Sequence, residues 1–275
     1  MQNRIFKHFQ GFVRTPPIFP NIFLDLSLFR ENFETQSLST QILKLVEIKE
    51  NTVLGKRVEQ FFKIAIEADD NLNLIAHNIQ IHNEERTLGE LDFILKDLSE
   101  NQIFHIELMY KFYVYDPDFS TEMDRWIGPN RKDSLLQKIK KVKINQLPLL
   151  HTPEVKKYLK SLDIKSEDIQ QEICFKASLF IPKELSTYNF PHINKECIIG
   201  FWVHLKDFSN YDKKDLKFFA PEKQDWPVDP KHGVEWFSFK RINEQIQHLH
   251  LRKKSPLIWI KQPDGFFERL IVVWW

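Results

Sequence analysis

Apolar positions near the start of the chain recur at the spacing of an amphipathic helix. Ile5, Phe6 and Phe9 lie on one face of such a helix, and Pro16-Pro17 breaks the pattern. A second helical pattern covers 38–49. We therefore expect a helical N-terminal segment with an interruption at the prolines.

The next helical pattern runs from residue 51 to about Ala68. Asn51 or Thr52 can cap this helix, because both side chains can accept a hydrogen bond from a free backbone N–H. Its apolar face consists of Leu54, Val58, Phe61, Phe62 and Ala65.

The pattern then changes to the period of strands. Residues 72–82, 89–95 and 103–115 have strand-like apolar patterns, and polar turns at 83–86 and 97–101 separate them. Turns this short predict that consecutive strands pair in an antiparallel way.

Helical patterns return over 132–146 and 153–162, and 173–181 is expected to be a fourth strand. The order is therefore α-β-β-β-α-β. It predicts an α/β (α+β) fold in which helices flank a mixed central sheet.

The last part of the chain follows Pro182 and mixes strands with one helix. Pro263-Asp264-Gly265 is a favourable hairpin turn between two of these strands. The expected strands are 198–205, 234–239, 257–260 and 267–275, and the expected helix is 242–251. We divide the chain into a helical N-terminal extension (1–50), a core (51–205) and a C-terminal α/β extension packed on the core (206–275).

Composition narrows the class of protein without naming a function. The 275 residues are 42% apolar and 28% charged, as in ordinary globular proteins, and the net charge of +1 means that any basic surface must be local. Cys174 and Cys197 lack metal-ligand spacing and indicate reduced core thiols. No signal peptide and no run of 18 apolar residues is found, so we expect a cytoplasmic protein without a membrane span.

Two of the predicted strands carry acids where a buried strand should have none. Asp92 and Glu107 interrupt apolar runs, and a carboxylate in a sheet core is costly unless it is paired or binds a metal. In an antiparallel hairpin of this length the two acids can face each other at one end of the sheet. Lys111 lies on the same strand face as Glu107, because side chains repeat every second residue.

These residue types suit a metal-dependent phosphodiesterase. Asp92 and Glu107 supply the oxygen ligands that Mg²⁺ prefers, and the metal activates water. Lys111 can stabilise the transition state or orient the attacking water. Glu59, beside the apolar face of the preceding helix, can be an outer ligand or a support.

A different interpretation stays open for the same residues. Glu107 and Lys111 can form an internal ion pair, and Asp92 can hydrogen-bond to a turn. Glu90 shares a face with Asp92 and is expected to be a charge at the rim.

The helix expected over 132–146 is strongly basic. Such clusters bind phosphate backbones, although a lysine run is also typical of a solvated helix face. The basic residues are Arg131, Lys132, Lys138, Lys140, Lys141 and Lys143, and further contributors to a site are Asp133 and Gln137.

Tryptophans are frequent towards the end of the chain. They suit either base stacking or packing between elements. The residues concerned are Trp226, Trp236, Trp259, Trp274 and Trp275.

The acidic strands resemble the PD-(D/E)XK nuclease superfamily, through Gly89-Glu90-Leu91-Asp92-Phe93-Ile94 followed by Glu107 and a lysine on the next strand. More narrowly, the chain resembles the bacterial domain-of-unknown-function family 1853. The segments that carry this resemblance are LIAHNIQ (74–80), RTLGELD (86–92), HIEL (105–108) with KFY (111–113), and WIGPN (126–130) with Asp133 and Lys138.

The resemblance implies a restriction-endonuclease-like core and a Mg²⁺-dependent nuclease. It makes Asp92 and Glu107 metal ligands and Glu59 the carboxylate of the helix. The chain departs from the superfamily pattern at Met109, where a lysine is expected two residues after the glutamate. Lys111 stands two residues further along, a shift of about 6–7 Å on the same face.

We therefore expect a nuclease that uses Mg²⁺ or Mn²⁺ and acts on DNA in preference to RNA, with Lys111 assisting the two ligands. Nucleic acid is expected to contact Arg131, Lys132, Gln137, Lys138 and Lys141. Two alternatives remain. One is a catalytically inactive nucleic-acid-binding protein of the same fold, and the other is a protein-interaction module that uses the Trp-rich C-terminal region.

Overall fold

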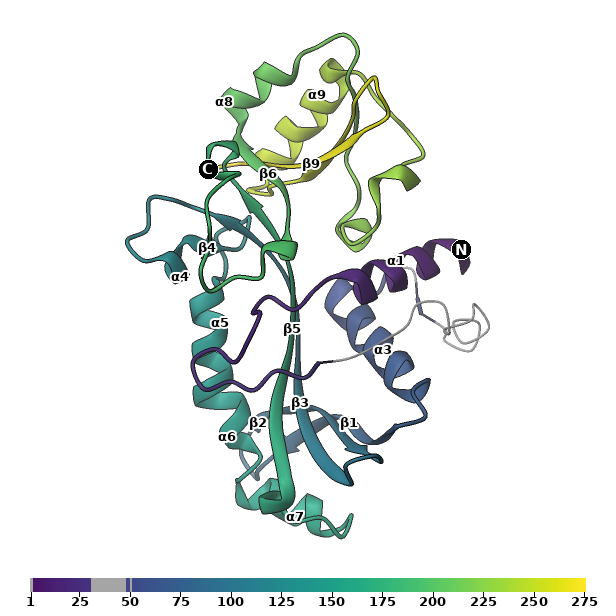
Figure 1. Ribbon diagram of the computed structural model, residues 1–275, viewed down its shortest axis with the longest axis vertical. Helices are drawn as coiled ribbons and strands as arrows, with labels where there is room; N and C mark the ends of the chain where they lie inside the picture. The colour runs from purple at the N-terminus through teal and green to yellow at the C-terminus, as the bar shows by residue number, and fades with distance from the viewer. Residues whose placement is uncertain (1, 31–47, 50) are drawn as a thin grey trace. The chain divides into compact units, whose positions relative to one another are not determined.

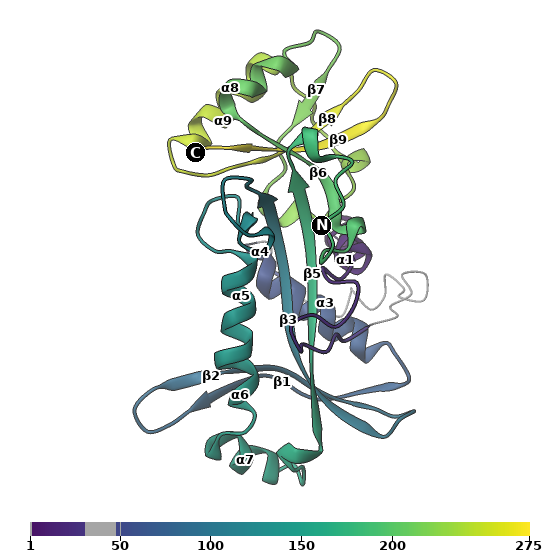
Figure 2. The same ribbon diagram turned by 60° about the vertical axis from the view of Figure 1, so that its left-hand side comes forward.

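A nine-stranded sheet organises the part of the chain that the structure describes (Figures 1 and 2). The structure is a computed structural model, and it describes residues 2–30, 48–49 and 51–275. The strands are β1 (Leu72–His82), β2 (Thr87–Asp97), β3 (Gln102–Tyr115), β4 (Trp126–Ile127), β5 (Ile169–Ile181), β6 (Ile198–His204), β7 (Lys217–Phe219), β8 (Leu257–Lys261) and β9 (Phe267–Val273). Their order in the sheet is β1-β2-β3-β5-β6-β9-β8-β7, and β4 pairs with β3 outside this path.

The sheet is mixed, as predicted. Strand β1 pairs with β2, β2 with β3, β7 with β8 and β8 with β9 in an antiparallel way. Strand β6 runs parallel to both β5 and β9. The predicted α/β class is therefore confirmed.

From α3 to β5 the longer elements follow the predicted order α-β-β-β-α-β, and the short α4 and β4 are inserted between β3 and α5. The α-helices are α1 (Gln2–Arg14), α3 (Leu54–Glu67), α4 (Glu122–Arg125), α5 (Leu135–Lys141), α6 (Leu147–Leu149), α7 (Pro153–Lys160), α8 (Leu205–Phe208) and α9 (Phe239–His250). A π-helical turn, η1 (Val142–Gln146), joins α5 to α6.

Two compact units divide the chain, and each is described by itself. The first unit comprises Met1–Ile18, Lys111–Leu136 and Ala177–Trp275, and the second comprises Phe19–Tyr110 and Gln137–Lys176. The division into an N-terminal extension, a core and a C-terminal extension has other boundaries and stays a prediction.

The core of the second unit lies between the strands β1 and β2 and the helices that pack against them. Phe62 of α3 packs edge-on against Phe93 of β2, with ring centroids 4.7 Å apart. A further apolar cluster joins β1 and β2 to α6 and α7. Its members are Ile81, Leu91, Ile94, Leu149, Leu150, Val155, Leu159 and Ile169.

The first unit has its core between α9 and the strands β7, β8 and β9, which are labelled together in Figure 2. Ile242 and Ile246, one helical turn apart, face the buried side of these strands. The turn predicted between β8 and β9 is confirmed, and Gly265 adopts a φ of +86°, which favours glycine.

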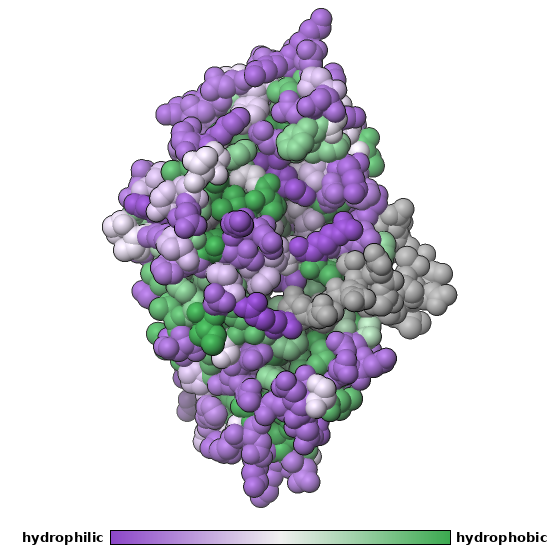
Figure 3. Space-filling model, in the orientation of Figure 1, coloured by the Kyte–Doolittle hydropathy of each residue, from purple (hydrophilic) through white to green (hydrophobic). Residues whose placement is uncertain are grey.

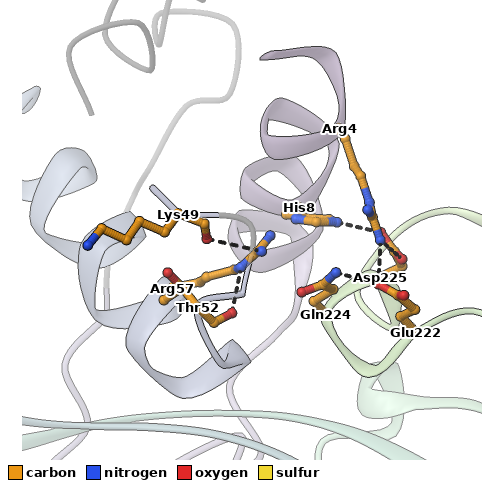
Figure 4. Close-up of polar contacts among 8 residues, drawn as sticks. All are labelled: Arg4, His8, Lys49, Thr52, Arg57, Glu222, Gln224 and Asp225. Carbon is orange, nitrogen blue, oxygen red and sulfur yellow. Dashed lines mark hydrogen bonds and ion pairs between the residues drawn. The ribbon is translucent and has the colours of Figure 1, made fainter. Parts of the chain in front are cut away.

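Several predicted boundaries differ from the structure, and the start of α3 is one of them. Helix α3 begins at Leu54 after an extended Val53, so neither Asn51 nor Thr52 caps it. The preceding backbone instead forms a turn in which the buried Arg57 guanidinium donates to the carbonyl of Thr52 at 2.9 Å (Figure 4).

Further differences lie later in the chain, where β5 begins at Ile169 and not at residue 173. Residues 234–239 form only one isolated bridge, between Phe237 and Phe218, because α9 already begins at Phe239. The basic helix begins at Leu135 and not at Lys132. The helix expected over 38–49 lies outside the described residues, apart from its last two positions.

Hydrophilic residues cover most of the face shown in Figure 3, and the hydrophobic patches on it are separate. None of the described helices is long and apolar enough to cross a membrane.

Candidate active site

Asp92 and Glu107 come together on neighbouring strands of the second unit. The antiparallel ladder of β2 and β3 pairs Phe93 with Ile106, so the next step of the register sets Asp92 against Glu107. Asp92 Oδ2 accepts a hydrogen bond from the backbone N–H of Leu108 at 2.9 Å. The expected juxtaposition of the two acids is therefore what the structure contains.

The Asp92 carboxyl is held in an environment that opposes its charge. Burial, followed by the negative charge of Glu107, raises its pKa to about 7, and the hydrogen bond from Leu108 lowers it only in part. The carboxylates of Glu59 and Glu90 add to the increase. A cation at this position would relieve all of these effects together.

Glu107 is completely buried, and one of its carboxylate oxygens makes no hydrogen bond with the described residues. Gln146 Nε2 donates to Oε2 at 2.5 Å, but Oε1 has no hydrogen-bond partner among the described residues. His105 Nε2 lies 3.2 Å from Oε1 without the alignment of a hydrogen bond. An unsatisfied oxygen on a buried carboxylate is rare, and such oxygens in proteins commonly contact an ion or an ordered water.

His105 is fixed beside this oxygen by a glutamine of β5. Gln171 Nε2 lies 3.0 Å from His105 Nδ1 and also donates to the carbonyl of Leu147 at 2.7 Å. Since Gln171 donates to Nδ1, the proton of the neutral imidazole belongs on Nε2. The histidine is itself completely buried, so its orientation is determined by packing and by Gln171.

The π-helical turn places Gln146 against Glu107. A π-helix shifts the register by one residue relative to an α-helix, and such turns occur often at functional sites. Gln146 is the last residue of η1, and its Oε1 lies 3.4 Å from the Lys138 ammonium of α5. Lys138 therefore supports Glu107 through Gln146.

Lys56 is a cation that faces the acids of this unit. Its ammonium lies 2.8 Å from Glu59 Oε2 and 3.7 Å from Glu90 Oε1. The hydrogen bond to Glu59 raises the pKa of Lys56 against the effect of burial, and the charges of Glu59, Glu90 and Asp92 raise it further. Its side chain is 54% exposed, so the ammonium is open to a ligand from solvent.

Glu59 is shared between Lys56 and a residue of β1. Asn78 Nδ2 donates to Glu59 Oε2 at 2.9 Å, while Asn78 Oδ1 is buried and has no hydrogen-bond partner among the described residues. Asn78 has a φ of +52° and stands between His77 and Ile79, whose partners on β2 are Phe93 and Leu91. The register therefore sets Asn78 against Asp92, in one row with Glu107.

The chemistry of this cluster fits a hard divalent cation held by two carboxylates. Within the described ranges, no three His, Cys, Asp or Glu side chains converge tightly enough to enclose an ion. Mg²⁺ does not require such a cage, because it keeps several waters and is commonly bound through one or two carboxylates and the phosphates of a substrate. Asp92 and the unsatisfied oxygen of Glu107 meet this requirement.

Comparison with protein families identifies the chain. The model of the family described as Domain of unknown function (DUF1853) matches residues 29–268. The chain belongs to this family. No curated protein and no solved structure matches it. Four acids, Glu59, Glu90, Asp92 and Glu107, form what we call the carboxylate cluster. The matched segment contains all four.

Lys111 is paired with another residue expected to contribute to a site. Its ammonium lies 2.7 Å from Asp133 Oδ2 in the first unit. The loop that carries Asp133 is tight at Gly128, where an added Cβ would come within 2.2 Å of Asp133 Oδ1. Gly128 and Asp133 of the family resemblance thus have a structural role in presenting this carboxylate to Lys111.

The residues expected to contact nucleic acid have different environments. Arg131 is bound to Asp116 at 2.6 Å and lies over the ring of Trp275, so it has a structural role. Lys138 supports Gln146 as described above. Lys132, Gln137 and Lys141 are exposed on the surface.

The tryptophans of the C-terminal region are mainly packing residues. Trp226 is 7% exposed and Trp259 is 2% exposed, and Trp226 packs edge-on against Phe112 at 5.0 Å. The remaining three are partly buried. They offer little surface for base stacking.

Gln146 and Lys56 were missed by the sequence reasoning, but Gln146 left a signal. It continues the apolar stripe of Ile139 and Val142, and a polar residue on a buried face needs a partner. Lys56 gives no such signal, because a lysine in the first turn of a helix is ordinary.

Proposed function

We propose that the protein is a metal-dependent nuclease that hydrolyses phosphodiester bonds, with DNA as the favoured substrate. The observation that carries the proposal is the pair formed by Asp92 and Glu107, in which one buried carboxylate oxygen makes no hydrogen bond with the described residues and the neighbouring acid has a pKa of about 7. This is the electrostatic environment that a bound divalent cation would neutralise. The resemblance of the same strands to the PD-(D/E)XK superfamily supports the assignment.

Each residue of the cluster has a defined task in this proposal. Asp92 and Glu107 hold the ion, which when bound lowers the pKa of a coordinated water and neutralises charge on the phosphate. Gln146 keeps the Glu107 carboxylate in one orientation. Lys56 takes the role that the superfamily gives to a lysine near the acids, since its charge faces Asp92 and it is accessible to a phosphate.

The test is the nicking of supercoiled DNA with Mg²⁺ or Mn²⁺. Asp92→Asn and Glu107→Gln keep the shape of each side chain and remove its charge, and each is expected to slow cleavage at least about a hundredfold, since a metal contributes several kcal/mol to stabilising the transition state. Glu85→Gln, in the exposed turn between β1 and β2, is the matched control and should cleave at the wild-type rate. Equal rates in all four proteins, or cleavage in EDTA, would contradict the proposal.

Two residues of strand β3 favour a second candidate function. Met109, which occupies the position of the superfamily lysine, is buried, and Lys111 is engaged by Asp133. A protein that kept the fold and lost the reaction would have these features. It would bind DNA with an affinity that falls with salt and does not depend on a divalent cation.

A further inference from the structure

A pocket with a volume of about 170 Å³ lies within the first unit and shares no residue with the carboxylate cluster. One side is the face of α1 that carries Lys7 and Arg14. The other lining residues include His232 of the short helix Pro230–His232, Arg269 of β9 and Ser178 of β5. Basic side chains thus enter it from three separate segments.

Helix α1 is fixed where it forms this pocket. Arg4 Nε and the completely buried His8 both bond to Asp225, at 2.9 and 2.6 Å, as Figure 4 shows. One turn further on, Gly11 approaches the backbone of Pro227 so closely that an added Cβ would lie 2.4 Å from its carbonyl oxygen. These contacts hold the pocket open in one geometry without using Lys7 or Arg14.

Lys7 and Arg14 are left without partners of their own. Neither makes an ion pair or a side-chain hydrogen bond with the described residues, although Arg4 on the same helix makes several. They are seven residues apart, which places them on one face of the helix. Burial and the positive charges of Lys7 and Arg14, among others, lower the pKa of His232. Both cations are therefore close enough to His232 to affect its charge.

Ser178 adds a neutral donor that is also unused. It is only 4% exposed, and its hydroxyl has no hydrogen-bond partner among the described residues. Because Ser178 lines the pocket, its hydroxyl can donate to a group bound there.

The acids of the pocket do not cancel this charge. Asp229 is already bound by the Lys231 ammonium at 3.2 Å and accepts the backbone N–H of Lys231 at 3.0 Å. Glu196 is exposed to solvent. The positive charges of Lys7 and Arg14 therefore remain available.

We propose that this pocket binds a phosphate dianion, as inorganic phosphate or as the terminal phosphate of an ester. Lys7 and Arg14 neutralise the two charges, and Ser178 donates to a phosphate oxygen. The volume is well below the roughly 300 Å³ at which pockets for drug-sized ligands begin, so the enclosed group is small. This inference is independent of the proposed nuclease activity.

The experiment titrates the full-length protein with inorganic phosphate at constant ionic strength and follows the His232 ring signals by NMR. We expect a saturable shift that chloride does not produce. A 5′-phosphorylated trinucleotide and its unphosphorylated counterpart are titrated in parallel. Tighter binding of the phosphorylated form assigns the site to nucleic-acid ends, and equal binding of the two assigns it to free phosphate or a small ester.

Charge-matched variants separate a specific site from general attraction. Arg14→Gln and Lys7→Gln are each expected to weaken phosphate binding at least about tenfold, which is the size of one charge-assisted hydrogen bond. Lys240→Gln removes the same charge from an exposed position of α9 outside the pocket and should change the affinity less than about twofold. No saturable shift in the wild type, or the same loss in all three variants, would overturn the proposal.

Discussion

At the scale of single residues, the pKa of Asp92 reflects the burial and the charges around it. It lies in a strand that is otherwise apolar, and burial together with the charge of Glu107 raises its pKa to about 7. The sequence was sufficient to single out Asp92 and Glu107, because an acid at a buried strand position needs compensation. It was not sufficient to show that one oxygen of Glu107 is unsatisfied.

The raised pKa predicts how Asp92→Asn changes stability with pH. The unfolded carboxyl loses its proton near pH 4 and the folded one near pH 7, so this group makes the wild type less stable as the pH rises between these values. An asparagine cannot ionise. In EDTA at pH 8 the variant should therefore melt at a higher temperature than the wild type, and its free energy of unfolding should be larger by a few kcal/mol at most. Both differences should shrink towards pH 4.

Asp70→Asn is the control for this measurement, because Asp70 is an exposed acid of the same unit. Its melting temperature should follow that of the wild type at both pH values. A destabilised Asp92→Asn protein at pH 8 would show that the Asp92 charge is already compensated within the fold.

Lys56 carries a second prediction at the scale of one side chain. Lys56→Gln should lower the rate of DNA cleavage at least about tenfold and leave the affinity for Mn²⁺ nearly unchanged, because Lys56 faces the substrate phosphate and is not a ligand. Lys63→Gln is the matched control on the same helix, since Lys63 is ion-paired with Glu67. An unchanged cleavage rate would remove Lys56 from the site.

At the scale of elements, the π-helical turn η1 connects a basic helix to the buried acid. It brings Gln146 to Glu107 and leaves its neighbour Asn145 exposed. Periodicity predicts a helix over this segment and cannot distinguish an α-turn from a π-turn, because the distinction depends on the contact with Glu107. The start of α3 was not predictable from periodicity either. The Arg57 guanidinium, within the helix, donates to the carbonyl of Thr52, and α3 begins only at Leu54.

Gln146→Ala tests this element. The substitution leaves the buried Glu107 carboxylate without its hydrogen-bond donor and should destabilise the protein by about 1–3 kcal/mol in the absence of metal. Added Mn²⁺ should restore part of the loss, because the ion compensates the same charge. Asn145→Ala should have a small effect that Mn²⁺ does not change, and thermal melts of the two variants with and without Mn²⁺ measure both. A loss in Gln146→Ala that Mn²⁺ leaves unchanged would contradict the proposed ion site.

At the scale of the whole molecule, the order of the longer elements was predictable because the apolar positions of each one recur with a helix or strand period. The three consecutive strands β1 to β3 and the hairpin of β8 and β9 follow from alternation and from turn residues. Strand β7 has three residues and β4 has two, and elements this short have no period to detect. The two-unit division could not be predicted, since it depends on contacts between segments far apart in the chain.

The pairing of Asp92 with Glu107 is the feature on which the proposed function depends, and its affinity for a divalent cation can be measured directly. Calorimetric titration of Mn²⁺ into the wild type, Asp92→Asn, Glu107→Gln and the control Glu85→Gln, at pH 8, is the most direct test. We predict saturable binding in the wild type and in Glu85→Gln, and affinities at least about tenfold weaker in the other two variants. The absence of saturable heat in the wild type, or equal affinities in all four proteins, would contradict a metal site at this pair.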